Sequence, residues 1–390
     1  MNSVAKRRLI GQYVGADGGL RPDAGAADDF FFEGPCAMRV LIVGNGNERF
    51  LGGRFYNTER KLANGFIRNG HLLHFFSDRD VARRATIFRS SRAGRGEANR
   101  RFLDVARNFQ PDFIVFTHSC LISTETFVEA KRLPQAPRLA QVCVDPMFRR
   151  VNVDFLKDRA SVVDATFVTT AGEVLAQFSS PTNVSSYIPS EVDASIETAR
   201  AFERSDQSFD VFFAANAAGD RPGDVRRATP ALIVKSGKAS LDYHGFDGRP
   251  PVFGIEYFRR LADARMALNI NSDRAEQANV RAPAEELYLY NSNRICQIMG
   301  CGLLTLSFRV NQLMELFEED REMVFADTPE EMLDAVLRYK RDDAARRRVA
   351  EAGWRKSHEE LNERLVARYI EEVAFRRALS HPYIWPTKLW

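Results

Sequence analysis

Short apolar runs alternate with stretches of helical periodicity in the first half of the chain. The apolar runs cover residues 40–43, 72–76, 113–116, 139–144 and 165–169. Helical spacing of apolar residues occupies about 55–69 and 125–133 between them. Runs of this length, closed by glycine or polar residues, are typical of buried strands. Their alternation with helices predicts a parallel sheet with right-handed crossovers.

A second alternation follows residues 187–193, a proline-containing segment without periodicity that we interpret as a linker. Further apolar runs lie at 209–214, 230–235, 266–270, 303–306 and 324–326. We expect helices from Asn291 to Met299, from Pro329 to about Tyr339, and twice within residues 344–377. Thr328 followed by Pro329 is a common helix start, with a side-chain cap and a first-turn proline.

The repeated pattern predicts an α/β protein with two doubly wound, Rossmann-like domains that face each other across a cleft. We expect an N-terminal domain over residues 38–190 and a C-terminal domain over 191–360, followed by a helix and tail over 361–390. Residues 1–37 contain a stretch rich in glycine, alanine and aspartate, so we expect a poorly ordered leader there.

The composition is that of an ordinary globular protein, with 45% hydrophobic and 27% charged residues. The 55 basic and 52 acidic residues give a net charge of +3, which is too small to indicate a nucleic-acid partner. No run of about 18 uncharged apolar residues occurs, which argues against a membrane span and a signal peptide and favours the cytoplasm. The five cysteines include no C-x-x-C pair, so we expect no disulfide and no zinc site. No H-x-x-x-H spacing occurs either, and we expect no required metal.

A polar run opens the helix that we expect from Asn291. Asn291, Ser292, Asn293 and Arg294 stand at its start, where first-turn N–H groups carry a positive partial charge that suits a diphosphate. Gln297, one turn later, can hold ribose hydroxyls. The alternative is a capped helix packed on a sheet and closed by the glycines that follow.

Two loops lie where such sheets bind ligands, at the carboxyl ends of strands. In the loop after the first strand, Gly52 and Gly53 let the backbone approach a phosphate or a sugar, unless they form only a turn. Asn216 and Arg221 follow the first strand of the second domain, where a basic side chain would meet a diphosphate in place of a metal. A solvated arginine-rich loop is the alternative there.

His118 and Asp145 each follow an apolar run of the first domain. We expect both at one sheet edge, because the carboxyl ends of parallel strands meet there. Glycosyl transfer needs a base for the acceptor proton or a group that stabilises the cationic transition state, and either residue can supply one. At a strand end each can also be only a turn-former or a cap.

The second half of the chain resembles a known family. Residues 254–258, 268–270, 293–302, 329–331 and 350–353 carry the motifs, in order, of group-1 glycosyltransferases of the CgeB-like kind. Weaker similarity extends over the first half. The resemblance implies the GT-B fold, in which the second domain holds a nucleotide-sugar donor, the first meets the acceptor, and the last helix packs back on the first domain. It also implies that Asn293, Arg294 and Gln297 lie at the diphosphate and ribose.

The resemblance further implies a glycosyltransferase without a cofactor, for which the nucleotide-sugar is a co-substrate. The acceptor would be a hydroxyl of a surface glycan, a polysaccharide or a lipid-linked sugar. The chain departs from related retaining enzymes, which carry glutamates where Leu289 and Gln297 stand. A non-catalytic nucleotide-sugar or glycan-binding protein on the same fold is therefore an alternative, and an epimerase or phosphorylase ranks below it.

The last ten residues, His381 to Trp390, are rich in aromatic side chains. Such a tail can dock on its own protein, or it can bind a partner or a membrane interface. Peripheral association with the inner face of a membrane is therefore left open.

Overall fold

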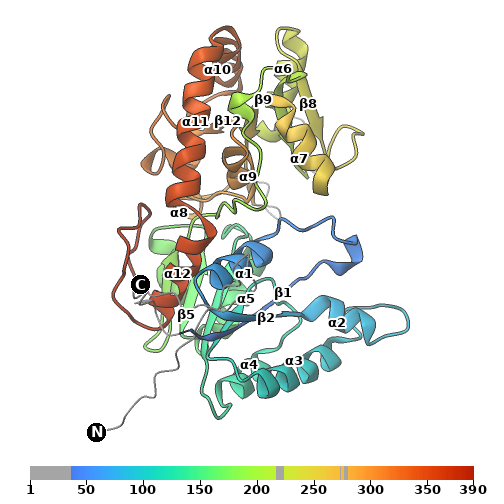
Figure 1. Ribbon diagram of the computed structural model, residues 1–390, viewed down its shortest axis with the longest axis vertical. Coiled ribbons are helices and arrows are strands. Elements are labelled where there is room, and N and C mark those ends of the chain that lie inside the picture. The colour runs from blue at the N-terminus through green and yellow to red at the C-terminus, as the bar shows by residue number, and fades with distance from the viewer. Residues whose placement is uncertain (1–36, 217–223, 273, 276–279) are drawn as a thin grey trace, which may run out of the picture. The chain divides into compact units, whose positions relative to one another are not determined.

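The computed structural model describes residues 37–216, 224–272, 274–275 and 280–390. Residues 1–36 of the predicted leader lie outside the described residues. From Met38 to Trp390 the chain forms one compact unit. This unit contains two parallel sheets, each with helices packed on both faces (Figure 1).

The first sheet has six parallel strands in the order β2-β1-β3-β4-β5-β6. The strands are β1 (Arg39–Gly44), β2 (Leu72–Ser77), β3 (Phe113–Phe116), β4 (Arg138–Cys143), β5 (Ala165–Val168) and β6 (Val184–Tyr187). Its helices are η1 (Glu48–Phe50), α1 (Thr58–Arg68), α2 (Asp78–Arg84), α3 (Arg95–Phe109), α4 (Thr124–Lys131), α5 (Arg150–Ala160) and η2 (Glu173–Phe178). Val40 and Ile42 pack with α1 and α5, whereas Leu41 and Val43 pack with α3 and α4, because alternate residues of a strand face opposite sides. The strand order reverses between β1 and β3, which creates a crevice at their carboxyl ends.

The second sheet has five parallel strands in the order β13-β12-β9-β7-β8. The strands are β7 (Phe209–Ala214), β8 (Leu241–His244), β9 (Ala264–Asn269), β12 (Leu304–Phe308) and β13 (Val324–Ala326), and β10 (Arg274–Ala275) pairs separately with β11 (Val280–Arg281). The longer helices are α6 (Val225–Ser236), α7 (Gly254–Ala262), α9 (Arg294–Gly300), α10 (Pro329–Arg341), α11 (Asp343–Glu360) and α12 (Glu363–Ala374). Short turns are η3 (Ala201–Glu203), α8 (Ala284–Leu287), η4 (Arg309–Asn311) and η5 (Leu313–Glu315). Here the order reverses between β7 and β9, so the second crevice lies at the ends of these strands.

Most predicted strands are confirmed, and β3, β7 and β13 have the bounds expected from their apolar runs. Four of the described strands were not predicted: the short pair β10 and β11, β6, which lies next to the segment interpreted as a linker, and β8. The sequences of β6 and β8, VSSY and LDYH, contain too many polar residues to form an apolar run. The apolar run at residues 230–235 belongs to helix α6.

Helix α12 comes late in the sequence but packs on the first sheet, beside α1 (Figure 1). The hydroxyl oxygens of Tyr369 and Ser186 lie 2.6 Å apart, and the rings of Phe375 and Phe113 are 5.4 Å apart between centroids. The two helices approach closely at Gly65, where an added Cβ atom would lie 2.2 Å from the carbonyl oxygen of Glu363. Only glycine fits that position of α1.

A buried ionic cluster connects α1 with the segment between the sheets and with α9. The Lys61 ammonium lies 2.7 Å from the Glu197 carboxylate and donates to the Glu191 carbonyl oxygen at 2.9 Å and to Cys296 Sγ at 3.1 Å. Burial alone would lower the pKa of Lys61, but Cys296 and the two carboxylates raise it above its ordinary range. Burial raises the pKa of Glu191 to about 8 and also raises that of Glu197, and of the two carboxylates it is Glu197 that contacts the ammonium.

The aromatic tail docks on its own protein. The backbone of Trp390 exchanges two hydrogen bonds with Ser185 on the outer strand β6, at 3.1 and 3.2 Å, and the Trp385 side chain is buried. Among the described residues, no helix has the length and apolar character needed to cross a membrane.

We expect Gly65→Ala to reduce the free energy of unfolding by about 1–3 kcal/mol, because the extra methyl group would force α1 and α12 apart. Urea denaturation measures this change. Gly96→Ala is the matched control, since an added Cβ in α3 meets no atom within 4 Å. Equal effects of the two substitutions would contradict the close approach of α1 and α12.

Candidate functional site

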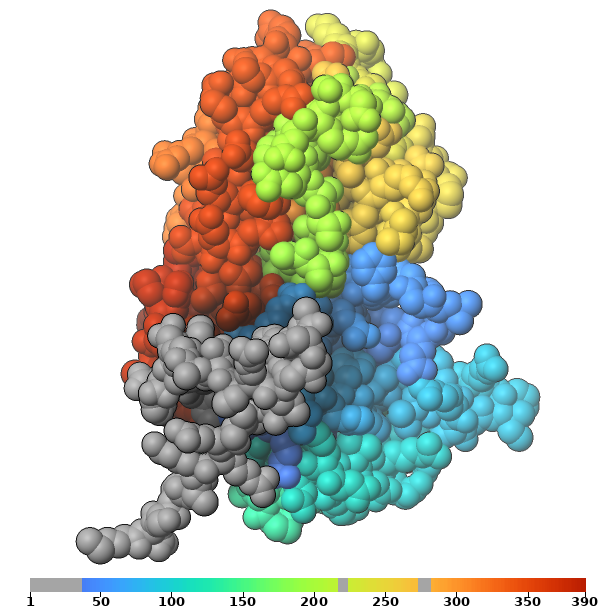
Figure 2. All heavy atoms as spheres, in the orientation of Figure 1, coloured from blue at the N-terminus to red at the C-terminus, as the bar shows by residue number. Residues whose placement is uncertain are grey.

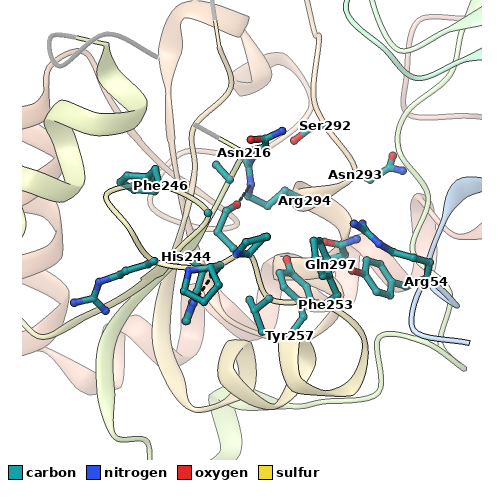
Figure 3. Close-up of a pocket in the computed structure, with 18 of the residues that line it drawn as sticks. Arg54, Asn216, His244, Phe246, Phe253, Tyr257, Ser292, Asn293, Arg294 and Gln297 are labelled. Atoms are coloured by element: carbon teal, nitrogen blue, oxygen red, sulfur yellow. Dashed lines mark hydrogen bonds between the residues drawn. The ribbon is translucent and has the colours of Figure 1, made fainter. Parts of the chain in front are cut away.

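A cavity of about 1240 Å³ lies at the carboxyl ends of both sheets. Together with residues 214–216 at the end of β7, three segments form most of its lining: the loop between β1 and α1, the loop between β8 and α7, and the start of α9 (Figure 3). All three segments adjoin the two crevices where the strand orders reverse, which is where open α/β sheets bind ligands.

Arg294 lies at the crevice of the second sheet. Its Nε donates to the carbonyl oxygen of Ala214 at the end of β7, at 3.0 Å, and its Nη1 donates to that of Ile270 just after β9, at 2.8 Å. Burial lowers the pKa of the guanidinium to about 10, so it keeps its charge at neutral pH. The side chain therefore fixes the ends of two strands, a role that the sequence analysis did not predict, and it also lines the cavity.

The other predicted residues of this segment have different surroundings. Helix α9 begins at Arg294, three residues later than expected, so Asn291 and Ser292 precede it. Ser292, Asn293 and Gln297 line the cavity, whereas Asn291 is outside its described lining and donates to the Leu289 carbonyl oxygen at 3.2 Å. Asn293 donates to the Thr58 hydroxyl at 2.6 Å, which links α9 to the first turn of α1.

The loop between β1 and α1 reaches the second domain. Gly52 has a φ of 87°, which favours glycine, and the Gly53 N–H donates to the Phe50 carbonyl oxygen at 2.8 Å. Neither glycine is in the described lining of the cavity, but Phe50 and Arg54 on either side of them are. The glycines thus form the turn that presents these two side chains.

Arg54 and Tyr56 contact aromatic residues at the start of α7, and we call these four residues, Arg54, Tyr56, Phe253 and Tyr257, the interdomain stack. The Arg54 guanidinium lies 3.7 Å from the centre of the Phe253 ring, and the rings of Tyr56 and Tyr257 stack 5.7 Å apart at 11°. Figure 3 shows Arg54 extending toward Phe253 and Gln297. Cation–π and stacking contacts of this kind each contribute about 0.5–1.5 kcal/mol, so the stack adds modest stability to the contact between the domains.

His118 and Asp145 lie together, as the ends of neighbouring strands β3 and β4 require. His118 Nε2 lies 3.5 Å from Asp145 Oδ2, and its Nδ1 lies 2.8 Å from Oε1 of Glu59 in the first turn of α1. Glu59 is buried, with a side chain 3% exposed, and the sequence analysis did not include it. The three groups are outside the described lining of the cavity. Asp145 is nevertheless close to Tyr290: burial raises the pKa of the Tyr290 hydroxyl most, and the charge of Asp145 raises it further.

We call His118, Glu59 and Asp145 the His118 triad. Contacts among the three side chains determine their protonation states. Burial alone would lower the pKa of His118, but hydrogen bonds and attraction from Asp145 and Glu59 raise it to about 10. Burial alone would raise the pKa of each carboxyl, and the imidazolium instead lowers both. At neutral pH His118 is therefore a cation between two carboxylates and cannot accept a proton.

The remaining predicted residues are Asn216, which lines the cavity, and Arg221, which lies outside the described residues. Two further residues of the lining were not predicted from the sequence: His244 at the end of β8 and Phe253 in the loop that follows, because β8 itself was not predicted. A glycine- and proline-rich run from Gly245 to Pro251 was the signal that could have marked a ligand-binding loop there.

The described residues contain no group of three or more histidine, cysteine, aspartate or glutamate side chains placed to hold a metal ion. One Asp-x-Asp spacing, Asp78 and Asp80, occurs at the start of α2. The Asp80 carboxylate accepts hydrogen bonds from the Ser77 hydroxyl and the Arg83 guanidinium, and the same hydroxyl accepts from the Gly46 N–H. Asp78 accepts from the Leu121 N–H at 3.0 Å. Burial raises the pKa of Asp78 to about 6. Both carboxyls thus have protein partners.

Residues 226–372 match a family model described as glycosyl transferase-like. The match covers most of the second domain and α12, and it supports the resemblance to group-1 glycosyltransferases, while the CgeB-like subgroup stays a prediction. No curated protein sequence matches the chain.

Solved structures of glycosyltransferases share the fold. An alpha-glucosyltransferase in complex with UDP and a 13-mer DNA has a TM-score of 0.61 at 10% identity, over 87% of this chain and 100% of that chain. Sucrose-phosphate synthase from Thermosynechococcus elongatus has a TM-score of 0.54 at 10% identity, over 87% and 98% of the two chains. AviGT4, a glycosyltransferase involved in Avilamycin A biosynthesis, has a TM-score of 0.53 at 12% identity, over 87% and 97%. The prediction of a GT-B fold with two Rossmann-like domains is confirmed.

We expect the free energy of unfolding to fall as the pH rises from about 6.5 to about 10, because native His118 keeps a proton that the unfolded chain releases. His118→Ala should flatten this decline. At pH 7 the same substitution should destabilise the protein by about 3 kcal/mol, since it leaves the buried Glu59 carboxylate without its cation.

Urea titrations at pH 6, 8 and 10 measure both effects. His381→Ala, in the tail, should keep the slope of the unsubstituted protein. Adding Glu59→Gln to His118→Ala should recover part of the lost stability, because the unpaired charge is then gone. Identical pH slopes for the protein and for His118→Ala would contradict the raised pKa.

Proposed function

We propose that the protein transfers a glycosyl group from a nucleoside diphosphate sugar to an acceptor hydroxyl, with the donor bound in the cavity. The proposal is supported by the GT-B fold, by the glycosyl transferase-like match over residues 226–372, and by the position of the cavity at both crevices. One of the similar structures is a glucosyltransferase in complex with UDP, which makes UDP the first nucleotide to test.

The observation that carries the proposal is the charge of the cavity. Its described lining has one acidic residue, Asp247, and five arginines: Arg49, Arg54, Arg227, Arg249 and Arg294. Asp247 already pairs with Arg227, so the remaining charge is positive. A diphosphate complements this surface, and arginine is the side chain best suited to phosphate oxygens.

Arg294 would serve the diphosphate from a fixed position. Two of its nitrogens are held by the ends of β7 and β9, and no described residue accepts a hydrogen bond from its Nη2. A guanidinium held in this way loses little freedom when a ligand binds. Gln297, one helical turn further on, would hydrogen-bond the ribose hydroxyls.

In the proposed reaction, the bond from the acceptor oxygen to the anomeric carbon forms as the bond from that carbon to the diphosphate breaks. The nucleoside diphosphate leaves with the bonding electrons, and the arginines offset its growing charge. The acceptor proton passes to a base. Asp145 is the candidate base because it is an ionised carboxylate, and it would act on an acceptor that extends from the cavity toward the end of β4. His118 is a cation that orients it. The interdomain stack would keep the domains closed and water away from the donor.

A second candidate is a non-catalytic protein that binds a nucleotide-sugar or a glycan on the same fold. It is favoured by Leu289 and Gln297, which stand where related retaining enzymes have glutamates. Release of nucleoside diphosphate in the presence of an acceptor distinguishes the two, because only a transferase turns the donor over. The acceptor class that we propose is a surface-glycan, polysaccharide or lipid-linked hydroxyl.

We expect a UDP-sugar to raise the melting temperature in a thermal-shift screen that also includes GDP-, dTDP- and CMP-sugars, because a ligand that binds only the native state stabilises it. Gln297→Ala should weaken binding of the active nucleotide about 5- to 10-fold through loss of one hydrogen-bonding group. Isothermal titration measures the affinity.

Asn271→Ala is the matched control, because this amide lines a separate cavity of about 650 Å³ beside β9 and β12. Its affinity should equal that of the unsubstituted protein. If no nucleotide-sugar shifts the melting temperature, or if Asn271→Ala weakens binding and Gln297→Ala does not, the donor does not bind in the cavity at α9.

A further inference from the structure

Three large apolar side chains stand almost fully in solvent on two loops of the first domain. Ile87 is 96% exposed, Leu51 is 95% exposed and Phe88 is 93% exposed, and these are the highest values among the large apolar residues described. Ile87 and Phe88 are at the tip of the loop between α2 and α3, and Leu51 follows η1. A single exposed leucine is common on a protein surface. Adjacent exposed isoleucine and phenylalanine side chains at a loop tip are unusual and indicate an interaction site.

The two loops stand side by side. Arg84 at the end of α2 forms an ion pair with Glu48 of η1, and the Glu48 N–H donates to Asp80 of α2 at 3.2 Å. Figure 2 shows both loops projecting from the same side of the first domain. The three apolar side chains therefore lie on neighbouring loops that project from the same side, and we call Leu51, Ile87 and Phe88 together the apolar tip.

Hydrogen bonds and a tight turn hold the longer loop away from the rest of the protein. The Thr86 hydroxyl oxygen accepts from the Ser90 N–H at 2.8 Å. Gly94 brings the chain back against α2 so closely that an added Cβ would lie 1.9 Å from the Ala82 carbonyl oxygen. The exposure of Ile87 and Phe88 is thus built into the local structure.

The surroundings of the apolar tip are positively charged. From Val81 to Gly96 the chain has no acidic residue and five arginines: Arg83, Arg84, Arg89, Arg92 and Arg95. Arg83 and Arg84 pair with acidic residues, whereas Arg89 and Arg92 are exposed on either side of Ser90 and Ser91. Exposed apolar side chains with two exposed arginines beside them match the chemistry of an anionic lipid surface, with acyl chains below charged head groups.

We propose that the apolar tip binds the surface of an anionic membrane, with Leu51, Ile87 and Phe88 inserted among the lipids and Arg89 and Arg92 against the head groups. A nucleic acid would complement the arginines but not the three aliphatic and aromatic side chains. The aromatic tail does not provide this surface, because Trp385 is buried and Trp390 pairs with β6.

The apolar tip adjoins the cavity, and this position indicates which class of acceptor the protein would use. Leu51 shares its loop with Phe50 and Arg54, and both of these line the cavity. Resting on the proposed function, this proximity favours a lipid-linked acceptor over a free polysaccharide, since the membrane would present such an acceptor at the mouth of the cavity. Membrane binding itself does not depend on the transferase proposal.

The test is co-sedimentation of the full-length protein with vesicles of phosphatidylcholine alone or with one-third phosphatidylglycerol. We expect binding to the anionic vesicles only, and weaker binding at higher salt. Ile87→Ser/Phe88→Ser and Arg89→Ser/Arg92→Ser should each reduce the bound fraction about tenfold or more. The matched controls Val234→Ser and Arg341→Ser/Arg348→Ser, at exposed positions of the second domain, should bind like the unsubstituted protein.

Failure of the protein to bind anionic vesicles, equal binding to neutral ones, or full binding by Ile87→Ser/Phe88→Ser would overturn the proposal. Binding of a duplex DNA without binding of vesicles would place a nucleic acid on this surface instead. The nucleotide thermal shift is measured on the same variants and should not change. If no nucleotide-sugar shifts the melting temperature of the unsubstituted protein, while that protein still binds anionic vesicles, the result counts against the proposed function and leaves the membrane surface standing.

Discussion

A single buried ammonium group ties the two domains to each other. Lys61 extends from α1 and contacts Glu197 and the Glu191 backbone between the sheets, as well as Cys296 of α9. A buried ion pair adds little net stability compared with a hydrophobic core, but removing one partner strands the other charge and costs about 3–5 kcal/mol. Such an interaction therefore fixes a geometry more than it strengthens a fold. Here it fixes the start of α1 relative to α9, and these two helix starts border the cavity and the His118 triad.

Hydrogen bonds to both backbone and side-chain atoms hold the candidate site in place. Arg294 binds the carbonyl groups at the ends of β7 and β9, and Asn293 binds the hydroxyl at the start of α1. The strand ends around the second crevice are thus held by side chains from the same helix that faces the cavity. This arrangement fixes the shape of the cavity at the second crevice through hydrogen bonds of the protein itself.

The sequence predicted the fold well because buried parallel strands are apolar on both faces, as in β1 and β3. It failed where strands are polar, as in β6 and β8, since their burial comes from α12, the tail and the neighbouring strand rather than from their own composition. In the site, His118 and Asp145 came together as expected because β3 and β4 are neighbours. Glu59 was missed because a glutamate in the first turn of a helix is usually exposed, and only tertiary packing shows that it is buried. The contacts of Arg294 with two carbonyl groups depend on distant strands, which no local pattern encodes.

The return of α12 to the first sheet has a consequence for how the protein is made. During synthesis on a ribosome, the strands of the first sheet emerge long before residues 363–374, which cover one of its faces. Until then, apolar side chains of α1 and of several strands remain in water, and contacts between segments so far apart in sequence form slowly. The first sheet is accordingly complete only when nearly the whole chain has been translated, and until then its uncovered apolar face favours aggregation.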